Sequence, residues 1–269
     1  MIYLDIEKGI QMICPTCLTE ASRIVKNQCT LCYQKQYQKN KKLGIIKEKI
    51  LISSEQQEIL NGLMLGDGCI QYSSKESKNP RLCIVRSILD KDYMLWQYHK
   101  LETLCKSGIK HHSYFDERTN KTYYKVQLQS RSLPNLKTIR DRWYPDNNKV
   151  VPLDLQLTPL ICAVWFCDDG SIIHRNKKAT ELKLSTHGFS FEENLFLTSA
   201  LGKELNEKFR ICKDESKFYI AGSTKAALAF IEYIDNSFPE GMSRKSDKWR
   251  KVELWDGLQR GPYEKHIII

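Results

Sequence analysis

Two apolar segments of helical length, each ending in an aspartate followed by a glycine, constrain this chain more than any other feature. The first is LNGLMLGDG, residues 60–68, and the second is CAVWFCDDG, residues 162–170. Glycine commonly ends helices, so each segment predicts a helix whose last turn carries a carboxylate, Asp67 or Asp169. That end of a helix is already negative, which makes an anion there unfavourable. Two matched cases indicate a site for a cation, and oxygen ligands suit Mg²⁺.

The chain around the two segments repeats the same order of predicted elements. Each half reads αββαββα, so we expect an α+β protein built from two pseudo-twofold repeats, residues 43–150 and 151–269, the second with a basic C-terminal tail. The first half is predicted to contain helices at 55–67, 91–105 and 133–143 and strands at 69–73, 81–87, 109–115 and 121–129. The second half is predicted to contain helices at 159–169, 191–208 and 224–236 and strands at 171–174, 181–187, 209–213 and 217–221.

Polar and apolar residues alternate along several of these strands, which is typical of half-buried antiparallel sheets. A solvated sheet face would show the same alternation, but the outward residues here are the types that bond phosphates and base edges. We therefore expect a DNA-binding surface made of Gln71, Arg81, Arg86, Lys110, His112, Lys121, Tyr123, Lys125, Gln127, Gln129, Lys183, Ser185, Arg210, Lys213, Lys217 and Tyr219.

The charge balance agrees with a polyanionic partner. Lysine and arginine total 42 against 32 acidic residues, a formal net charge of +10. Nucleic acid is favoured over a membrane surface, because no apolar run is long enough to span a bilayer. The first residues lack a basic segment followed by an apolar core, so we expect an intracellular rather than a secreted protein.

The N-terminal segment carries a pattern of its own, two CxxC pairs separated by eleven residues: Cys14, Cys17, Cys29 and Cys32. This spacing predicts a structural Zn²⁺ site, with two disulfides or unbound thiols as the alternatives. The basic residues 33–42 follow as a predicted linker, which either tracks a phosphate backbone or serves as a solvated tether. We expect residues 1–42 to form a zinc finger with this linker, and the other six cysteines to be buried in a reducing compartment.

The paired motifs resemble the LAGLIDADG homing endonucleases, specifically the single-chain kind with two motif copies. The likeness extends over residues 53–250 and leaves the four cysteines outside. The most specific part is LTPL, residues 157–160, leading to WFCDDG. It is similar to the second motif of yeast-mitochondrial-type intron endonucleases, with Cys167 where methionine is usual.

The resemblance implies a metal site at the two motif ends. The eighth motif position, the metal ligand of the family, falls on Asp67 and Asp169. The carbonyl oxygens of the preceding residues, Gly66 and Asp168, would complete the coordination of Mg²⁺ or Mn²⁺.

The resemblance also implies two basic residues near the metals. Lys149 matches a family lysine in a K-x-x-P context, here KVVP. The second follows a proline near the C-terminus, where the family commonly has Tyr-Lys-Leu and this chain has Ser-Arg-Lys. Arg244 and Lys245 are both candidates for that position.

The activity implied is hydrolysis of one phosphodiester on each strand of a long, asymmetric double-stranded DNA target, across the minor groove, leaving 3′ overhangs. A monomer in a bacterial or phage-host cytoplasm, or in an organelle matrix, would perform it. Four other readings stay open: an intron RNA maturase, a DNA-binding regulator that no longer cuts, a zinc-ribbon transcription factor with an inert partner domain, and motif helices that serve packing alone.

Overall fold

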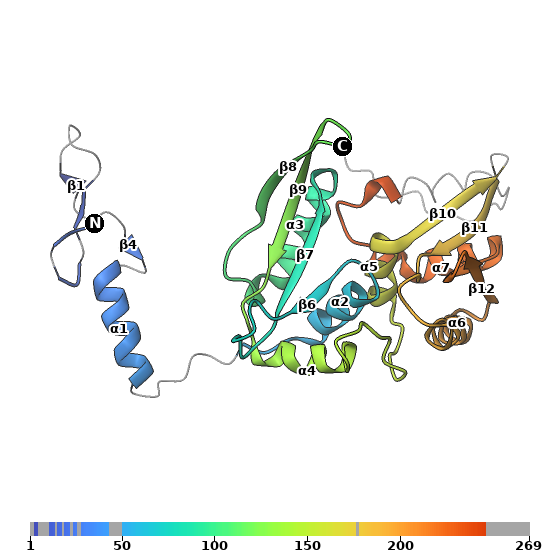
Figure 1. Ribbon diagram of the computed structural model, residues 1–269, viewed down its shortest axis with the longest axis horizontal. Helices are drawn as coiled ribbons and strands as arrows, with labels where there is room; N and C mark the ends of the chain where they lie inside the picture. The colour runs from blue at the N-terminus through green and yellow to red at the C-terminus, as the bar shows by residue number, and fades with distance from the viewer. Residues whose placement is uncertain are drawn as a thin grey trace. The chain divides into compact units, whose positions relative to one another are not determined.

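The structure is a computed structural model that describes residues 3–4, 11–13, 15–17, 19–21, 24–25, 28–42, 50–175 and 178–245. The chain divides into two units, Met1–Ile50 and Leu51–Ile269. The first unit contains a three-stranded sheet, a two-stranded hairpin and a helix (Figure 1): β1 (Tyr3–Leu4), β2 (Gln11–Ile13), β3 (Glu20–Ala21), β4 (Ile24–Val25), β5 (Gln28–Cys29) and α1 (Thr30–Lys42).

Helix α1 corrects the prediction of a linker at residues 33–42. The segment TLCYQKQYQKNKK is helical throughout. Its physical reason is local, because lysine and glutamine lose little rotamer freedom in a helix and the segment has no glycine or proline.

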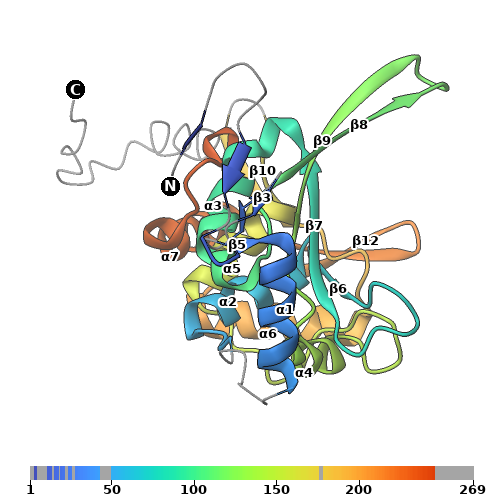
Figure 2. The same ribbon diagram turned by 90° about the vertical axis from the view of Figure 1, so that its left-hand side faces the viewer.

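The second unit begins with the first repeat. Its elements are α2 (Ser54–Leu65), β6 (Cys69–Gln71), β7 (Arg81–Ser87), η1 (Ile88–Asp90), α3 (Lys91–Leu101), η2 (Glu102–Leu104), β8 (Lys110–Asp116), β9 (Lys121–Gln129) and α4 (Pro134–Trp143). The four strands form one antiparallel sheet in the order β6-β7-β9-β8. The β8–β9 hairpin extends well beyond the helices that cover the rest of the sheet (Figure 2).

The second repeat has the same element order and sheet topology. It consists of α5 (Pro159–Asp169), β10 (Gly170–Arg175), β11 (Lys178–Leu184), α6 (Phe191–Leu205), β12 (Phe209–Asp214), β13 (Lys217–Gly222), α7 (Thr224–Ile234) and η3 (Asp235–Ser237), with the antiparallel order β10-β11-β13-β12. The αββαββα duplication is therefore confirmed. The predicted strand 181–187 was too long at its end, because beyond Leu184 the Thr186 hydroxyl bonds the buried amide of Asn194 and the chain turns toward α6.

Helices α2 and α5 pack directly against each other between the two sheets (Figure 1). Residues 59–65 of α2 and 161–167 of α5 are buried on all sides, which is typical of helical segments at the centre of a protein. Among the described residues, no helix is long and apolar enough to cross a membrane. Gly62 lies within this contact, and an added Cβ there would lie 2.7 Å from Val164 Cβ and 2.8 Å from the Ile161 carbonyl oxygen.

We expect Gly62→Ala to lower the free energy of unfolding by about 1–3 kcal/mol, because the methyl group would force α2 and α5 apart. Gly108→Ala is the matched control, since nothing lies within 4 Å of a Cβ at that position. Urea unfolding of the two variants measures the difference. Equal stabilities would show that the helices can separate without cost.

Candidate metal site and DNA-facing sheets

The side-by-side packing of α2 and α5 brings the ends of both motifs together. The backbone N–H of Asp67, just beyond α2, donates to Asp168 Oδ2 of α5 at 3.0 Å. Asp169 is the last residue of α5, and the carboxylates of Asp67 and Asp168 both act on its charge. Three carboxyl groups from two distant segments thus meet at one place. The motif ends that the sequence analysis paired are indeed adjacent.

Two lysines lie against the backbone oxygens at these helix ends in matching positions. Lys149 Nζ donates to the carbonyls of Gly66 and Gly68 at 2.8 and 3.0 Å. Lys245 Nζ donates to the equivalent carbonyls of the second motif, Asp168 at 3.2 Å and Gly170 at 2.8 Å. It also bonds the Phe166 carbonyl at 2.7 Å. Each lysine thereby offsets the negative end of one helix.

The structure distinguishes the two basic candidates near the C-terminus. Arg244 forms two hydrogen bonds with Asp90, from Nε at 2.7 Å and from Nη2 at 3.1 Å. Its neighbour Lys245 is buried and is the residue at the motif end. Of these two candidates, Lys245 is therefore the one that contacts the second motif, and Arg244 belongs to a different ion pair.

The crowding of charge perturbs the acid and base groups of the site. Burial, with the charges of Asp67 and Asp168, raises the pKa of Asp169 to about 7. Burial also raises the pKa of Asp168. For the lysines burial works in the other direction, lowering the pKa of Lys149 and bringing that of Lys245 to about 8, while the neighbouring carboxylates counteract it.

Arg86 is placed differently from the prediction. It was expected on the DNA-facing surface, but its side chain is only 3% exposed and forms ion pairs with Asp67 at 3.2 Å and Asp168 at 2.6 Å. The reason is strand parity, because Arg86 lies on the same face of β7 as the buried Leu82 and Ile84. That alternation is visible in the sequence and could have placed it correctly.

The remaining first-repeat candidates lie together on the other face of the sheet. The strand register pairs Gln71 with Arg81 and Lys110 with Gln127, which fixes one common face. Cys69 and Cys83 are half-buried on this face, unlike the fully buried Cys162 and Cys167. The face carries Gln71, Arg81, Lys110, His112, Lys121, Tyr123, Lys125, Gln127 and Gln129.

In the second repeat, Lys213 also lies on a different face of the sheet from the one predicted. Lys213 pairs across the sheet with Phe218, on the side packed against α6, so it does not share the surface of Lys217 and Tyr219. Arg210 lies on that surface but is paired with Glu181. Lys183 lies 4.2 Å above the Tyr219 ring. Ser185 follows β11, and its backbone N–H bonds the Asp169 carbonyl at 3.0 Å.

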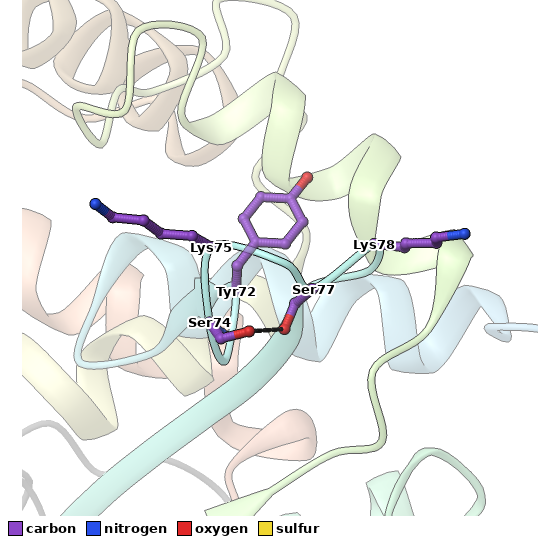
Figure 3. Close-up of a pocket in the computed structure, with 5 residues that line it drawn as sticks. All are labelled: Tyr72, Ser74, Lys75, Ser77 and Lys78. Atoms are coloured by element: carbon purple, nitrogen blue, oxygen red, sulfur yellow. Dashed lines mark hydrogen bonds between the residues drawn. The ribbon is translucent and has the colours of Figure 1, made fainter.

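The loop between β6 and β7 forms an open hollow that the sequence analysis did not identify (Figure 3). Ser77 Oγ holds the turn together through bonds to Ser74 N at 3.0 Å and Ser74 Oγ at 3.1 Å. Lys75 and Lys78 extend in opposite directions from this turn (Figure 3). Two exposed lysines on a short serine-rich turn beside the sheet are suited to contacts with phosphates.

In the first unit, three of the four predicted zinc ligands come together. The sulfur atoms of Cys17, Cys29 and Cys32 lie within 4.8 Å of one another, and those of Cys17 and Cys29 are 3.7 Å apart. Sulfurs bound at about 2.3 Å to one tetrahedral Zn²⁺ would be roughly 3.8 Å apart, so this cluster fits the ion. Cys14 lies outside the described residues.

The residues at the motif ends also fit a divalent cation. The side chain of Asp67 is 50% exposed, and the pKa of Asp169 is raised by burial and also by adjacent negative charge. A cation would relieve that repulsion, and carboxylate and carbonyl oxygens are the ligands it prefers. Asp168 is excluded as a side-chain ligand, because its carboxyl group is fully buried and bonded to protein donors.

The raised pKa of Asp169 makes stability depend on pH. In the unfolded chain the group has a pKa near 3.8, so the folded protein binds this proton more tightly and loses stability as pH rises through about 7. In EDTA, Asp169→Asn should therefore stabilise the protein at pH 8, by on the order of 1–3 kcal/mol, and change little at pH 4. Urea unfolding at both pH values measures this. Asp154→Asn, on the surface, should show no such gain; an equal gain for Asp169→Asn at both pH values would contradict the account.

Comparison with known proteins agrees with the geometry. The model of the LAGLIDADG DNA endonuclease family matches residues 57–230. An uncharacterized protein of Methanocaldococcus jannaschii is 29% identical over 212 residues, 76% of this chain and 80% of that protein. DNA endonuclease I-ChuI of Chlamydomonas applanata is 29% identical over 160 residues, 56% of this chain and 72% of that protein. Cytochrome b mRNA maturase bI2 of Debaryomyces hansenii is 24% identical over 185 residues, 66% of this chain and 68% of that protein.

A solved structure shares the fold. The homing endonuclease I-WcaI bound to its DNA recognition sequence superposes with a TM-score of 0.67 at 21% identity, covering 82% of this chain and 94% of that one. With the family match extending across both motifs and both sheets, the chain belongs to the LAGLIDADG DNA endonuclease family.

Proposed function

We propose that this protein is a divalent-metal-dependent endonuclease that cuts both strands of a specific double-stranded DNA target. The observation that carries the proposal is the pairing of Asp67 and Asp169 at adjacent helix ends, each accompanied by one lysine that bonds the carbonyl oxygens there. Helices packed for stability alone would need the glycines at their contact. They would gain nothing from carboxylates whose mutual repulsion opposes folding.

Asp67 and Asp169 would hold Mg²⁺ or Mn²⁺, together with the carbonyl oxygens of Gly66 and Asp168. A bound divalent ion supplies charge stabilisation for attacking and leaving oxygens in phosphodiester hydrolysis. Each of the two carbonyls accepts a lysine bond but has a second lone pair. The donor set is thus compatible with both the ion and the lysines.

Lys149 and Lys245 would stabilise the negative charge that develops on the phosphate. Each ammonium group is held by two or three carbonyl oxygens, so its position is set before a substrate arrives. An ammonium group held in a fixed position stabilises a transition state more than the ammonium group of a mobile surface lysine would. One lysine for each aspartate supports one cut on each strand, and the resemblance to the family supports cutting across the minor groove with 3′ overhangs.

The two sheet faces would bind the DNA on either side of the site. The polar face of the first repeat reaches along the exposed β8–β9 hairpin, where Tyr114 and Tyr123 stack and Lys125 lies 4.6 Å above the Tyr114 ring. The face of the second repeat is shorter and partly neutralised by Glu181. This difference between the repeats supports an asymmetric target, read by a monomer that contains both halves.

A second function is favoured by one observation. A relative that aligns over 66% of this chain is named a cytochrome b mRNA maturase. An RNA-binding protein on the same scaffold would use the exposed aromatic residues of the hairpin for base stacking. It would not require Asp67 or Asp169, so their substitution separates the two functions.

We expect Mg²⁺-dependent linearisation of a supercoiled plasmid that carries the uninterrupted host locus. Asp67→Asn and Asp169→Asn should each abolish it, and Lys149→Met or Lys245→Met should slow it by about 10²-fold or more, because each removes a fixed positive charge from the transition state. Arg244→Met should have a much smaller effect, since Arg244 is bonded to Asp90. Retention of full activity by both aspartate variants would refute the assignment and favour RNA or DNA binding without cleavage.

For the first unit we expect one equivalent of bound zinc that is lost in the Cys17→Ser, Cys29→Ser double variant, because three thiolates and Cys14 would form the site. Elemental analysis of the purified protein measures it, with Cys212→Ser as the control from outside the cluster. If the unit contacts DNA, the double variant should also reduce the dependence of target affinity on salt. Equal zinc content in the wild-type protein and the double variant would rule out the site.

A further inference from the structure

The seventh position of the two motifs breaks the symmetry of the repeats. Gly66 occupies it in the first motif and Asp168 in the second. A Cβ on Gly66 would lie 2.4 Å from Asp168 Cβ and 2.5 Å from Asp168 Oδ2. The carboxyl group of Asp168 therefore fills space that the first motif leaves open, and it crosses from the second repeat to the end of the first motif.

Among the residues that the structure describes, the hydrogen bonds to this carboxylate come from residues of the first repeat. Oδ1 accepts from Arg86 Nη2 at 2.6 Å and from the Tyr93 hydroxyl at 3.2 Å. Oδ2 accepts from the backbone N–H of Asp67 at 3.0 Å. A buried charge needs such partners, because an unpaired one is strongly destabilising. Asp168 thus holds the backbone of Asp67 directly.

Arg86 connects the same group to the side chain of Asp67. Its Nη1 donates to Asp67 Oδ2 at 3.2 Å, its Nε donates to Gln97 Oε1 at 3.2 Å, and its guanidinium lies 4.6 Å above the Tyr93 ring. Because the nitrogen atoms of the guanidinium all have partners and the side chain is buried, Arg86 is held in one orientation. Its charge is shared between the carboxylates of Asp67 and Asp168.

The second repeat has a different residue at the equivalent place. Arg86 precedes the N-cap of α3 by four residues, and Thr186 precedes the N-cap of α6 by four residues. Thr186 bonds Asn194 and carries no charge. In the described part of the chain, the connection therefore runs from the second repeat to Asp67 and has no counterpart toward Asp169.

We infer that Asp168, acting with Arg86 and Tyr93, is a positioning residue that sets the metal-binding carboxylate of Asp67, so that the second repeat controls the metal ligand of the first. Asp168 fixes the backbone of Asp67 and takes part of the charge of Arg86. Without it, Arg86 would pair more strongly with Asp67 and compete with the cation. The inference rests on the proposed metal-dependent function.

The test is a double-mutant cycle on Mn²⁺ affinity, measured by electron paramagnetic resonance of the free ion without DNA. Asp168→Asn should weaken Mn²⁺ binding by about tenfold in the wild-type background, which corresponds to roughly 1.4 kcal/mol. It should have little further effect in the Asp67→Asn background, because it acts through Asp67. In the Asp169→Asn background it should retain its tenfold effect.

A general loss of negative charge predicts something else. In that case Asp168→Asn would weaken Mn²⁺ binding equally in the Asp67→Asn and the Asp169→Asn backgrounds. That result would overturn the inference while leaving the proposed function intact. Unchanged Mn²⁺ affinity in Asp168→Asn would also overturn it. Absence of Mn²⁺ binding by the wild-type protein would overturn the proposed function and this inference together. Asp154→Asn, which removes a surface carboxylate, is the matched control for charge.

Tyr93→Phe is the second variant, because Asp168→Asn could reduce folding. It removes one bond to Asp168 and keeps the ring beneath Arg86. We expect a two- to threefold loss of Mn²⁺ affinity that vanishes in the Asp67→Asn background. A loss that persists there would contradict the inference.

Discussion

The close packing of α2 against α5 is the contact on which the rest of the structure depends. It requires a glycine at residue 62, because the neighbouring helix comes within 2.8 Å of where a Cβ would lie. Its consequence is electrostatic, since both helices end at the same place and present carbonyl oxygens and carboxylates to each other. The fold is therefore built around a concentration of negative charge that other parts of the chain must balance.

Three cations from different segments provide that balance. Lys149, from the connection between the repeats, and Lys245, beyond the last helix of the second, each bond the carbonyls of one helix end. Arg86, from the first sheet, bonds two of the carboxylates. Even so, burial, together with the charges of Asp67 and Asp168, raises the pKa of Asp169 to about 7, so its ionised form is disfavoured in the absence of a cation. A carboxylate whose negative charge is disfavoured until a cation binds is consistent with a metal-binding site.

Much of this arrangement could be predicted from the sequence. The duplicated order of elements and the bounds of α5 were predicted from hydrophobic periodicity and from Gly170 at the end of the helix; in the structure, Thr158 caps its start. Asp67 and Asp169 were predicted from the ends of the two apolar segments, and Lys149 from the resemblance to the family. The second basic residue was harder to predict. Arg244 and Lys245 are neighbours in the chain, and no local pattern indicates which of them lies at the motif end.

The contacts of Asp168 could not be predicted for a different reason. Its ion pair with Arg86 joins residues 82 apart in the chain, and only the packed helices bring them together. The assignment of residues to the two faces of each sheet was partly predictable. Strand parity was sufficient for most first-repeat candidates, but Arg86 and Lys213 were assigned by residue type rather than by parity, and both lie on the opposite face.

The central claim is that Asp67 and Asp169 bind a divalent cation where α2 and α5 end. Anomalous X-ray scattering from crystals grown with Mn²⁺ tests it most directly. The account predicts a peak within bonding distance of oxygen atoms from both carboxylates, adjacent to the carbonyls that Lys149 and Lys245 contact. A Mn²⁺-saturated crystal with no peak between the two carboxylates would contradict it.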